Sequence, residues 1–139
     1  NRLNFQISIL KKNGLINSTN SNEFEKALTI AKKLLPDNFT PSLCHGDLWH
    51  GNIINSIHGY TVLIDPAIYY GDPYSDLAML FLFSPVKNDL LNLYKKSLKI
   101  PFNEKVMHIY QLYHLMNHVN IFGSSYMPQT IRCLRKINE

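Results

Sequence analysis

The sequence predicts a mainly α-helical fold with one small β-hairpin, an α+β arrangement. Six segments carry apolar residues at helical spacing or over a helix length, which is typical of helices that pack against a core. Residues 53–65 instead consist of two β-prone runs around a turn-forming stretch. The chain has 139 residues, 45% of them hydrophobic. That is enough to bury such a core, and we expect one domain over residues 1–139.

Two helices are expected in the first part of the chain. The first should end near Gly14, because lysines fill its last turn and glycine readily ends a helix. A polar loop over residues 17–22 separates it from a second helix over residues 23–36. That segment has apolar residues at helical spacing and glutamates in its first turn, and Pro36 would end it.

The hairpin and four more helices account for the rest of the chain. The hairpin would turn at residues 56–59, and the following "AIYYGDP" segment, residues 67–73, is expected to be a loop. Within that loop Asp72 can cap the next helix. The four helices are expected over residues 74–83, 86–98, 103–122 and 127–137. The first of them is apolar on most faces and should be buried.

Composition argues against several classes of protein. The net charge is +4 and the lysines are spread over separate segments, whereas a nucleic-acid-binding protein would concentrate them on one face. The longest apolar run, residues 77–83, falls far short of the roughly 20 residues that span a bilayer. Two cysteines cannot form a dense disulfide framework. We therefore expect a cytoplasmic protein without a nucleic-acid or membrane partner.

A zinc site is one alternative for the chemistry. His114 and His118 are four residues apart on an expected helix, so they would share one face. The zinc-protease pattern also requires a glutamate directly after the first histidine, and this chain has Leu115 there. No third ligand is close in the sequence. We therefore expect at least one of the two to be a packed or surface histidine, and the alternative is that one of them lines a pocket.

A cysteine nucleophile is a second alternative. Cys44 precedes His45 directly, but neighbouring residues of a strand point to opposite faces, which is a poor geometry for a nucleophile and its base. We expect Cys44 to be a small buried apolar residue.

A third constellation matches phosphoryl transfer. The stretch "LCHGDLWHGNIIN" places His45, Asp47 and Asn52 at the spacing of the kinase catalytic loop, H-R-D-x-x-x-x-N. A carboxylate at Asp47 could orient and deprotonate an attacking hydroxyl, and the oxygen of Asn52 could bind magnesium. Asp65, at the end of the expected hairpin, is the second acid that a metal bridging the phosphates requires. A capped turn followed by a strand-ending aspartate remains the alternative.

Asp76 lies within an otherwise apolar helix segment. Because a buried carboxylate is costly unless it is hydrogen-bonded, we expect it to accept hydrogen bonds from backbone N–H groups of the catalytic loop. We assign His45, the first residue of the loop pattern, a supporting role as well.

The motifs together resemble a known family. "HGDLWHGN … LIDPAIYYGDPYSDLAMLF" is similar to the fructosamine/ketosamine kinases, which belong to the aminoglycoside-phosphotransferase-like branch of the protein-kinase fold. "IYQLYHLMNHVNIFGSSY" resembles the C-terminal helix of that family. The likeness covers most of the chain and begins inside the C-terminal lobe of that fold. His50 stands where the family usually has serine or glycine.

The resemblance implies a role for each matching residue. Asp47 would be the catalytic base, while Asn52 and Asp65 would hold Mg²⁺. Trp49 would present its ring to the sugar and His118 would line the sugar pocket. The cosubstrate would be ATP, and the acceptor a ketosamine, free or bound to a protein, phosphorylated on the sugar 3-hydroxyl. The adduct then falls apart, which serves deglycation.

The resemblance also implies a partner lobe. The sequence contains no G-x-x-x-x-G-K-[ST] or G-x-G-x-x-G motif, although a kinase of this fold needs an N-terminal lobe that covers the nucleotide phosphates. We expect residues 1–139 to be the acceptor-side, C-terminal catalytic lobe, with the nucleotide lobe missing and little activity alone. Two alternatives remain, a non-catalytic remnant that binds sugar-amines or a partner, and a kinase for another small hydroxylated or amino acceptor.

Overall fold

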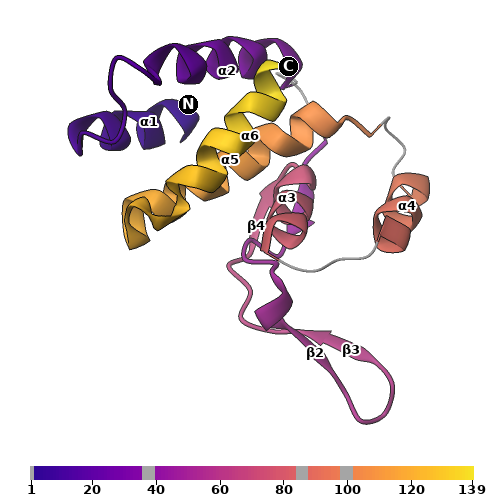
Figure 1. Cartoon of the computed structure of the whole chain (residues 1–139). Coiled ribbons are helices and arrows are strands. Elements are labelled where there is room, and N and C mark those ends of the chain that lie inside the picture. The colour runs from indigo at the N-terminus through magenta and orange to yellow at the C-terminus, as the bar shows by residue number, and fades with distance from the viewer. Residues whose placement is uncertain (1, 36–39, 84–87, 98–101) are drawn as a thin grey trace. The chain divides into compact units, whose positions relative to one another are not determined.

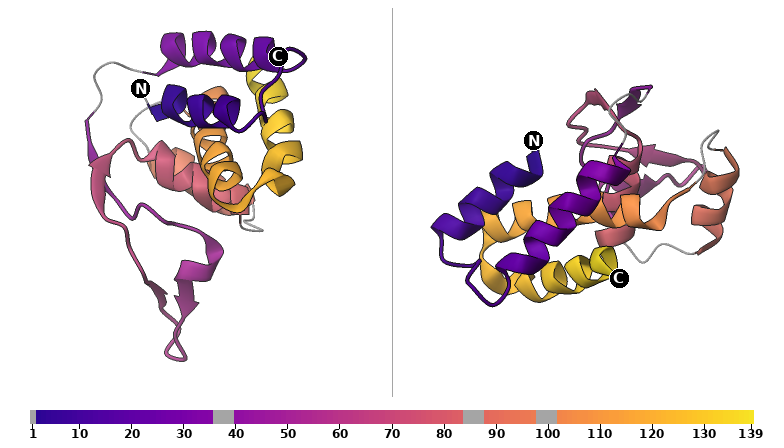
Figure 2. Two further views of the ribbon diagram at one scale, coloured as in Figure 1. Left: turned by 90° about the vertical axis from the view of Figure 1, so that its left-hand side faces the viewer. Right: turned by 90° about the horizontal axis from the view of Figure 1, so that it is seen from above.

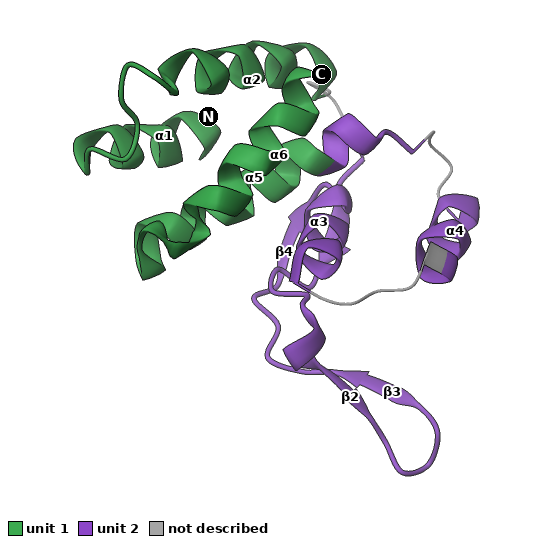
Figure 3. Cartoon of the chain, in the orientation of Figure 1, with its two compact units in different colours: residues 1–37, 108–139 green, residues 38–107 purple. Residues whose placement is uncertain are grey.

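The computed structural model describes residues 2–35, 40–83, 88–97 and 102–139 (Figure 1). It divides into two compact units (Figure 3). Unit 1 comprises residues 1–37 and 108–139, and unit 2 comprises residues 38–107. The expectation of one domain stays a prediction, and each unit is described by itself.

Unit 1 is helical. It contains α1 (Arg2–Lys12), α2 (Ser21–Leu34), most of α5 (Glu104–Phe122), a short 3-10 helix η2 (Ser124–Tyr126) and α6 (Met127–Asn138). α2 packs along α6 and also contacts α1. Its fully buried side chains lie on all four α-helices and include Leu10, Phe24, Ile109, Met116, Leu134 and Ile137. The apolar spacing that predicted these helices therefore marks the faces that form the core.

The end of α1 agrees with the sequence-based expectation. Gly14 has φ +70°, a conformation that glycine adopts without a steric penalty. Its N–H donates to the Lys11 carbonyl at 3.0 Å, and the N–H of Leu15 donates to the Leu10 carbonyl at 2.9 Å. This pair of bonds satisfies carbonyl groups that the last turn would otherwise leave open.

The described part of unit 2 contains two small antiparallel sheets, two α-helices of its own, a short 3-10 helix and the first residues of α5. β2 (Ile53–Asn55) pairs with β3 (Thr61–Leu63), with Ile54 opposite Val62, which confirms the expected hairpin. The hairpin extends away from the remainder of unit 2 (Figure 2), and all three β3 side chains are exposed. The helices are α3 (Tyr74–Phe83) and α4 (Asn88–Ser97).

The second sheet corrects the expectation that residues 67–73 form a loop. β4 (Tyr69–Gly71) pairs with β1 (Ser42–Cys44), so that Leu43 lies opposite Tyr70. Two adjacent tyrosines are β-prone, but their partner strand lies more than twenty residues earlier and gives no local signal. This sheet joins the strand that precedes residues 45–52, the expected catalytic loop, to the strand that leads into α3.

α3 is mostly buried, as its composition predicts, and Asp72 caps it. The Oδ1 atom of Asp72 accepts a hydrogen bond from the N–H of Tyr74 at 2.9 Å, which satisfies one free donor of the first turn. Pro36 and the expected ends of the fourth helix, residues 86–87 and 98, lie outside the described residues. Within the described ranges, no helix is both long enough and apolar enough to cross a bilayer.

Candidate active site

Residues 45–52, which the sequence predicts to be the catalytic loop and which are called the loop below, lie on a tight turn that follows β1. The N–H of Trp49 donates to the carbonyl of Asp47 at 3.1 Å, and the N–H of Asn52 donates to the carbonyl of Trp49 at 2.9 Å. The second of these bonds forms the one-turn 3-10 helix η1 (His50–Asn52), which leads directly into β2. The turn brings Asn52 back toward Asp47 although the two residues are five positions apart.

The amide of Asn52 is oriented by Asp47. Its Nδ2 atom donates to the Asp47 carbonyl at 2.8 Å and to Asp47 Oδ2 at 3.0 Å. Because both bonds use the amide nitrogen, the oxygen Oδ1 faces the other way and remains an available acceptor. Asn52 is buried, with 6% of its surface exposed, so this orientation is held by its surroundings. The second carboxylate oxygen of Asp47, Oδ1, is not used in the bond with Asn52 and can accept a hydrogen bond from another group.

His45 connects the loop to the end of the hairpin. Its Nδ1 faces the N–H of Asp47 at 3.4 Å, and its Nε2 lies 3.0 Å from the carbonyl oxygen of Ile64. These neighbours assign the ring proton to Nε2, because a carbonyl accepts and an N–H donates. The N–H of Ile64 donates in turn to the carbonyl of Asn52 at 3.0 Å. Both backbone groups of Ile64 are thus bound to the loop.

Asp65 is held between two points of contact with the loop. The residue before it, Ile64, is hydrogen-bonded to the loop. Two residues after it, the carbonyl oxygen of Ala67 lies so close to Gly46 that a Cβ added to Gly46 would overlap that oxygen. Asp65 itself has φ +50°, which aspartate tolerates better than most residues. Such strained backbone is concentrated at functional sites. The described residues offer its exposed carboxylate no hydrogen bond or ion pair.

Asp76, in the first turn of α3, makes the contact expected from the sequence. Its Oδ2 accepts a hydrogen bond from the N–H of His45 at 2.6 Å, and its Oδ1 accepts one from the N–H of Gly46 at 2.9 Å. Each carboxylate oxygen therefore holds one backbone donor of the loop. Charge-assisted bonds of this kind are short and about twice as strong as neutral ones.

Replacing Asp76 by asparagine is expected to destabilise the whole protein by about 2–3 kcal/mol. The amide group retains one acceptor and turns an N–H toward the second backbone donor. Urea unfolding of the full-length variant would measure the change. Asp89→Asn, at an exposed position in the first turn of α4, is the matched control. Equal midpoints for the two variants would contradict the role assigned to Asp76.

Trp49 and His50 form an exposed aromatic pair next to Asp47. The rings lie 5.9 Å apart at an interplanar angle of 70°, an edge-to-face arrangement. The indole covers Gly51, where a Cβ would collide with the ring. With 39% of its surface exposed, Trp49 presents a flat apolar wall. Its contact with a sugar stays a prediction.

His118 belongs to unit 1, whereas the loop belongs to unit 2, and its proposed place in the sugar pocket stays a prediction. Its Nδ1 lies 2.8 Å from the carbonyl of His114, and its ring packs against Phe122 and Tyr126 at centroid distances of 5.5 and 5.2 Å. Both histidines thus take part in helix and ring contacts. In the ranges that the structure describes, no group of three or more His, Cys, Asp or Glu side chains could hold a metal ion.

Cys44 is buried, with 2% of its surface exposed. Burial, together with the nearby Asp76 carboxylate, raises the pKa of its thiol, and only the thiolate is a strong nucleophile. Its Sγ faces the carbonyl of Asp72 at 3.7 Å. The surroundings of Cys44 are those of a packed residue.

The residues present fit a magnesium ion. Magnesium prefers oxygen ligands and usually takes only one or two carboxylates from the protein, the rest coming from phosphates and water. Asn52 Oδ1 and the Asp65 carboxylate have no hydrogen-bond partner among the described residues. The bonds of Ile64 attach the backbone before Asp65 to Asn52. This donor set is incomplete without phosphate oxygens.

The sequence model of the fructosamine kinase family matches residues 1–139. The chain belongs to the fructosamine kinase family. It is 37% identical over 137 residues to a probable ketoamine kinase from Vibrio vulnificus, a match that covers 98% of this chain and 46% of that protein. The chain spans about half the length of the curated relatives it matches.

Solved structures support the fold. A candidate fructosamine-3-kinase from Thermobifida fusca matches 95% of this chain and 46% of its own, with a TM-score of 0.79 and 29% identity. A choline kinase from Streptococcus pneumoniae matches 97% of this chain and 54% of its own, with a TM-score of 0.71 and 19% identity; this likeness shows the fold alone. The predicted fold class, the C-terminal lobe of a protein-kinase-like fold, is confirmed.

Two backbone contributors to the candidate site of this fructosamine kinase family member were not predicted from the sequence. Ile64 acts through its backbone N–H and C=O, and Ala67 through the carbonyl that lies against Gly46. Backbone groups are the same for every residue type, so no residue pattern identifies them. The sequence also gives no indication that Asp65 has a positive φ.

Proposed function

We propose that the whole protein containing this chain transfers the γ-phosphoryl group of ATP to a sugar hydroxyl of a ketosamine. The arrangement of Asp47 and Asn52 carries the proposal. The Asn52 amide nitrogen orients one oxygen of the Asp47 carboxylate, which leaves the other to face an acceptor hydroxyl. Family membership supports the choice of a ketosamine as the acceptor.

In this mechanism Asp47 takes the hydroxyl proton while the hydroxyl oxygen bonds to the γ-phosphorus. The bond between that phosphorus and the β–γ bridging oxygen breaks, and ADP leaves. Asn52 and Asp65 would hold Mg²⁺, which when bound would neutralise negative charge on the phosphates. His45 and Asp76 keep the loop in place, and Trp49 orients the sugar through its ring face.

We also propose that residues 1–139 alone do not catalyse phosphoryl transfer. Their relatives are about twice as long, and phosphoryl transfer needs groups that cover the nucleotide phosphates. The sequence has no glycine-rich phosphate-binding motif. The chain would therefore supply the acceptor side and the catalytic carboxylate.

The test is an assay of the whole protein with MgATP and a fructosyl-amine. We expect ADP release, and a product whose mass rises by one phosphoryl group, with the ketosamine but not with the unglycated amine. Choline would serve as a second acceptor. Phosphorylation of choline in place of the ketosamine would assign another small-molecule substrate. If neither the ketosamine nor choline is phosphorylated, the result would support the non-catalytic alternative.

A further inference from the structure

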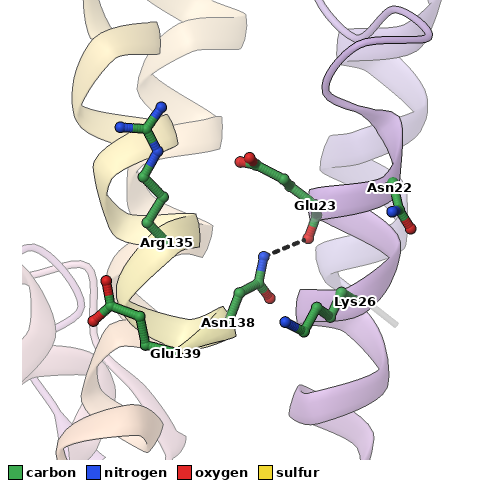
Figure 4. A pocket seen from close by; sticks show the side chains of 6 residues that line it. All are labelled: Asn22, Glu23, Lys26, Arg135, Asn138 and Glu139. Atoms are coloured by element: carbon green, nitrogen blue, oxygen red, sulfur yellow. Dashed lines mark hydrogen bonds between the residues drawn. The ribbon is translucent and has the colours of Figure 1, made fainter.

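A pocket of about 350 Å³ lies between α2 and α6 within unit 1 (Figure 4). Its lining includes two basic and two acidic side chains, which are Lys26, Arg135, Glu23 and Glu139. These charges favour no single class of ligand, and no residue of the loop contributes to the pocket. A contact within the loop, between Gly51 and Trp49, is by contrast specific to one side chain of the candidate site.

The indole of Trp49 lies directly on Gly51. A Cβ added to Gly51 would overlap three carbon atoms of the six-membered ring of the indole, which are Cζ2, Cζ3 and Cη2. These are the three atoms nearest to the added Cβ, and Gly51 is otherwise exposed. The indole therefore occupies the space that a side chain at position 51 would need.

The backbone conformation does not explain the glycine at position 51. The glycines with a positive φ are Gly14, Gly46, Gly59 and Gly123. Gly51 is not among them, so a residue with a Cβ could adopt its backbone conformation without left-handed strain. The absence of a side chain at this position is required by the ring that lies on it.

The backbone of Trp49 is bonded to both residues proposed for the chemistry. Its N–H donates to the carbonyl of Asp47 at 3.1 Å, and its carbonyl accepts a hydrogen bond from the N–H of Asn52 at 2.9 Å. The ring of His50 packs edge to face against the indole, with the centroids 5.9 Å apart. Because the backbone is fixed and the ring lies on Gly51, the indole has a defined position relative to the Asp47 carboxylate.

We propose that Gly51 is a positioning residue, which sets the affinity for the sugar of the acceptor through the indole of Trp49. The proposal rests on the proposed function, in which Trp49 orients the sugar. A side chain at position 51 would displace the ring, because the atoms in its way are the far end of a side chain that can rotate. The displaced ring would no longer face the sugar, whereas Asp47 and Asn52 would keep their hydrogen bonds. The loss should therefore fall on acceptor binding.

The test is steady-state kinetics of the whole protein with MgATP and a fructosyl-amine. In Gly51→Ala we expect the KM for the fructosyl-amine to rise roughly tenfold, since the aromatic contact with the sugar is lost. The KM for ATP and kcat should change by less than about twofold. Gly71→Ala is the matched control, because its added Cβ would also overlap an aromatic ring, that of Tyr69, at a position without a positive φ. It should leave the KM for the fructosyl-amine unchanged.

A double variant tests whether Gly51 acts through the indole. In a Trp49→Ala background, Gly51→Ala should cause no further rise in the KM for the fructosyl-amine, because the ring that it displaces is already gone. Fluorescence gives a readout that does not depend on turnover. Trp49 is the one tryptophan of the chain, and subtracting the spectrum of Trp49→Ala isolates its emission. In Gly51→Ala we expect acrylamide to quench this emission more strongly, as the ring turns toward solvent.

The proposal is overturned if Gly51→Ala leaves the KM for the fructosyl-amine or the quenching of Trp49 unchanged. An equal rise in KM in Gly71→Ala, or a further rise in the Trp49→Ala background, would also overturn it. So would a thermal unfolding curve showing that Gly51→Ala is unfolded, because the ring would then not have given way. With wild-type turnover of the fructosyl-amine, each of these results refutes the role of Gly51 alone. Without that turnover the proposed function is refuted, and this proposal with it.

Discussion

Replacing Asp47 by asparagine is expected to lower kcat of the whole protein by about two to four orders of magnitude. The asparagine oxygen can still accept the hydrogen bond from Asn52 Nδ2, now 3.0 Å from the carboxylate, so the loop should keep its conformation. The amide cannot take a proton from the acceptor hydroxyl, and the proton-transfer contribution is therefore lost. A coupled assay of ADP release with MgATP and a fructosyl-amine measures the change.

The control for Asp47→Asn is Asp89→Asn, which also removes one negative charge but lies at an exposed position on α4. Its kcat should equal that of the wild type. Unfolding curves for both variants separate a loss of chemistry from a loss of structure. Turnover of Asp47→Asn at the wild-type rate would refute the role of Asp47 as the base.

Replacing Gly46 by alanine is expected to destabilise the whole protein by roughly 2–4 kcal/mol. Gly46 has φ +83°, which strains any residue with a Cβ, and the added methyl group would also overlap the carbonyl oxygen of Ala67. That oxygen belongs to the backbone and cannot rotate aside. The loop and the Asp65 segment would have to separate, so kcat should fall as well. Urea unfolding and the ADP assay measure the two effects.

Gly59→Ala is the matched control for the contact with Ala67. Gly59 has a nearly identical φ of +84°, but nothing lies within 4 Å of its added Cβ. It should show only the cost of the left-handed backbone, about 1–2 kcal/mol, and full activity. The difference between the two variants isolates the contact between the loop and the Asp65 segment. Equal losses of stability would mean that this contact does not matter.

The helices could be predicted because their signal is local. The end of α1 at Gly14 and the cap of α3 by Asp72 depend on residues within one or two turns. The β1–β4 pairing was not predictable in this way, since its strands are separated by the whole catalytic loop and the hairpin. Pairing between strands so far apart in the sequence depends on the tertiary fold, and strands of three residues are too short to show a clear sequence pattern.

The candidate site shows the same division between side chains and backbone. The spacing of Asp47, Asn52 and Asp65 predicts phosphoryl transfer, because carboxylates and an amide oxygen are the groups that this reaction requires. A buried acid in an apolar helix likewise indicated that Asp76 needs backbone donors, and the structure supplies them from the loop. His118 lies in unit 1, and its role depends on an arrangement of units that spacing along the chain does not define.

The sequence by itself determined the types and order of the side chains assigned to the candidate site, together with the helices of the fold. The tertiary structure decided how those side chains are oriented. It turns the amide of Asn52 so that its nitrogen faces Asp47, and it binds both backbone groups of Ile64 to the loop. The physical reason is that the Ile64 contacts are made by backbone atoms, and the Asn52 contact depends on which end of its amide faces Asp47. Neither is encoded in residue identity, so each is defined only when distant segments pack together.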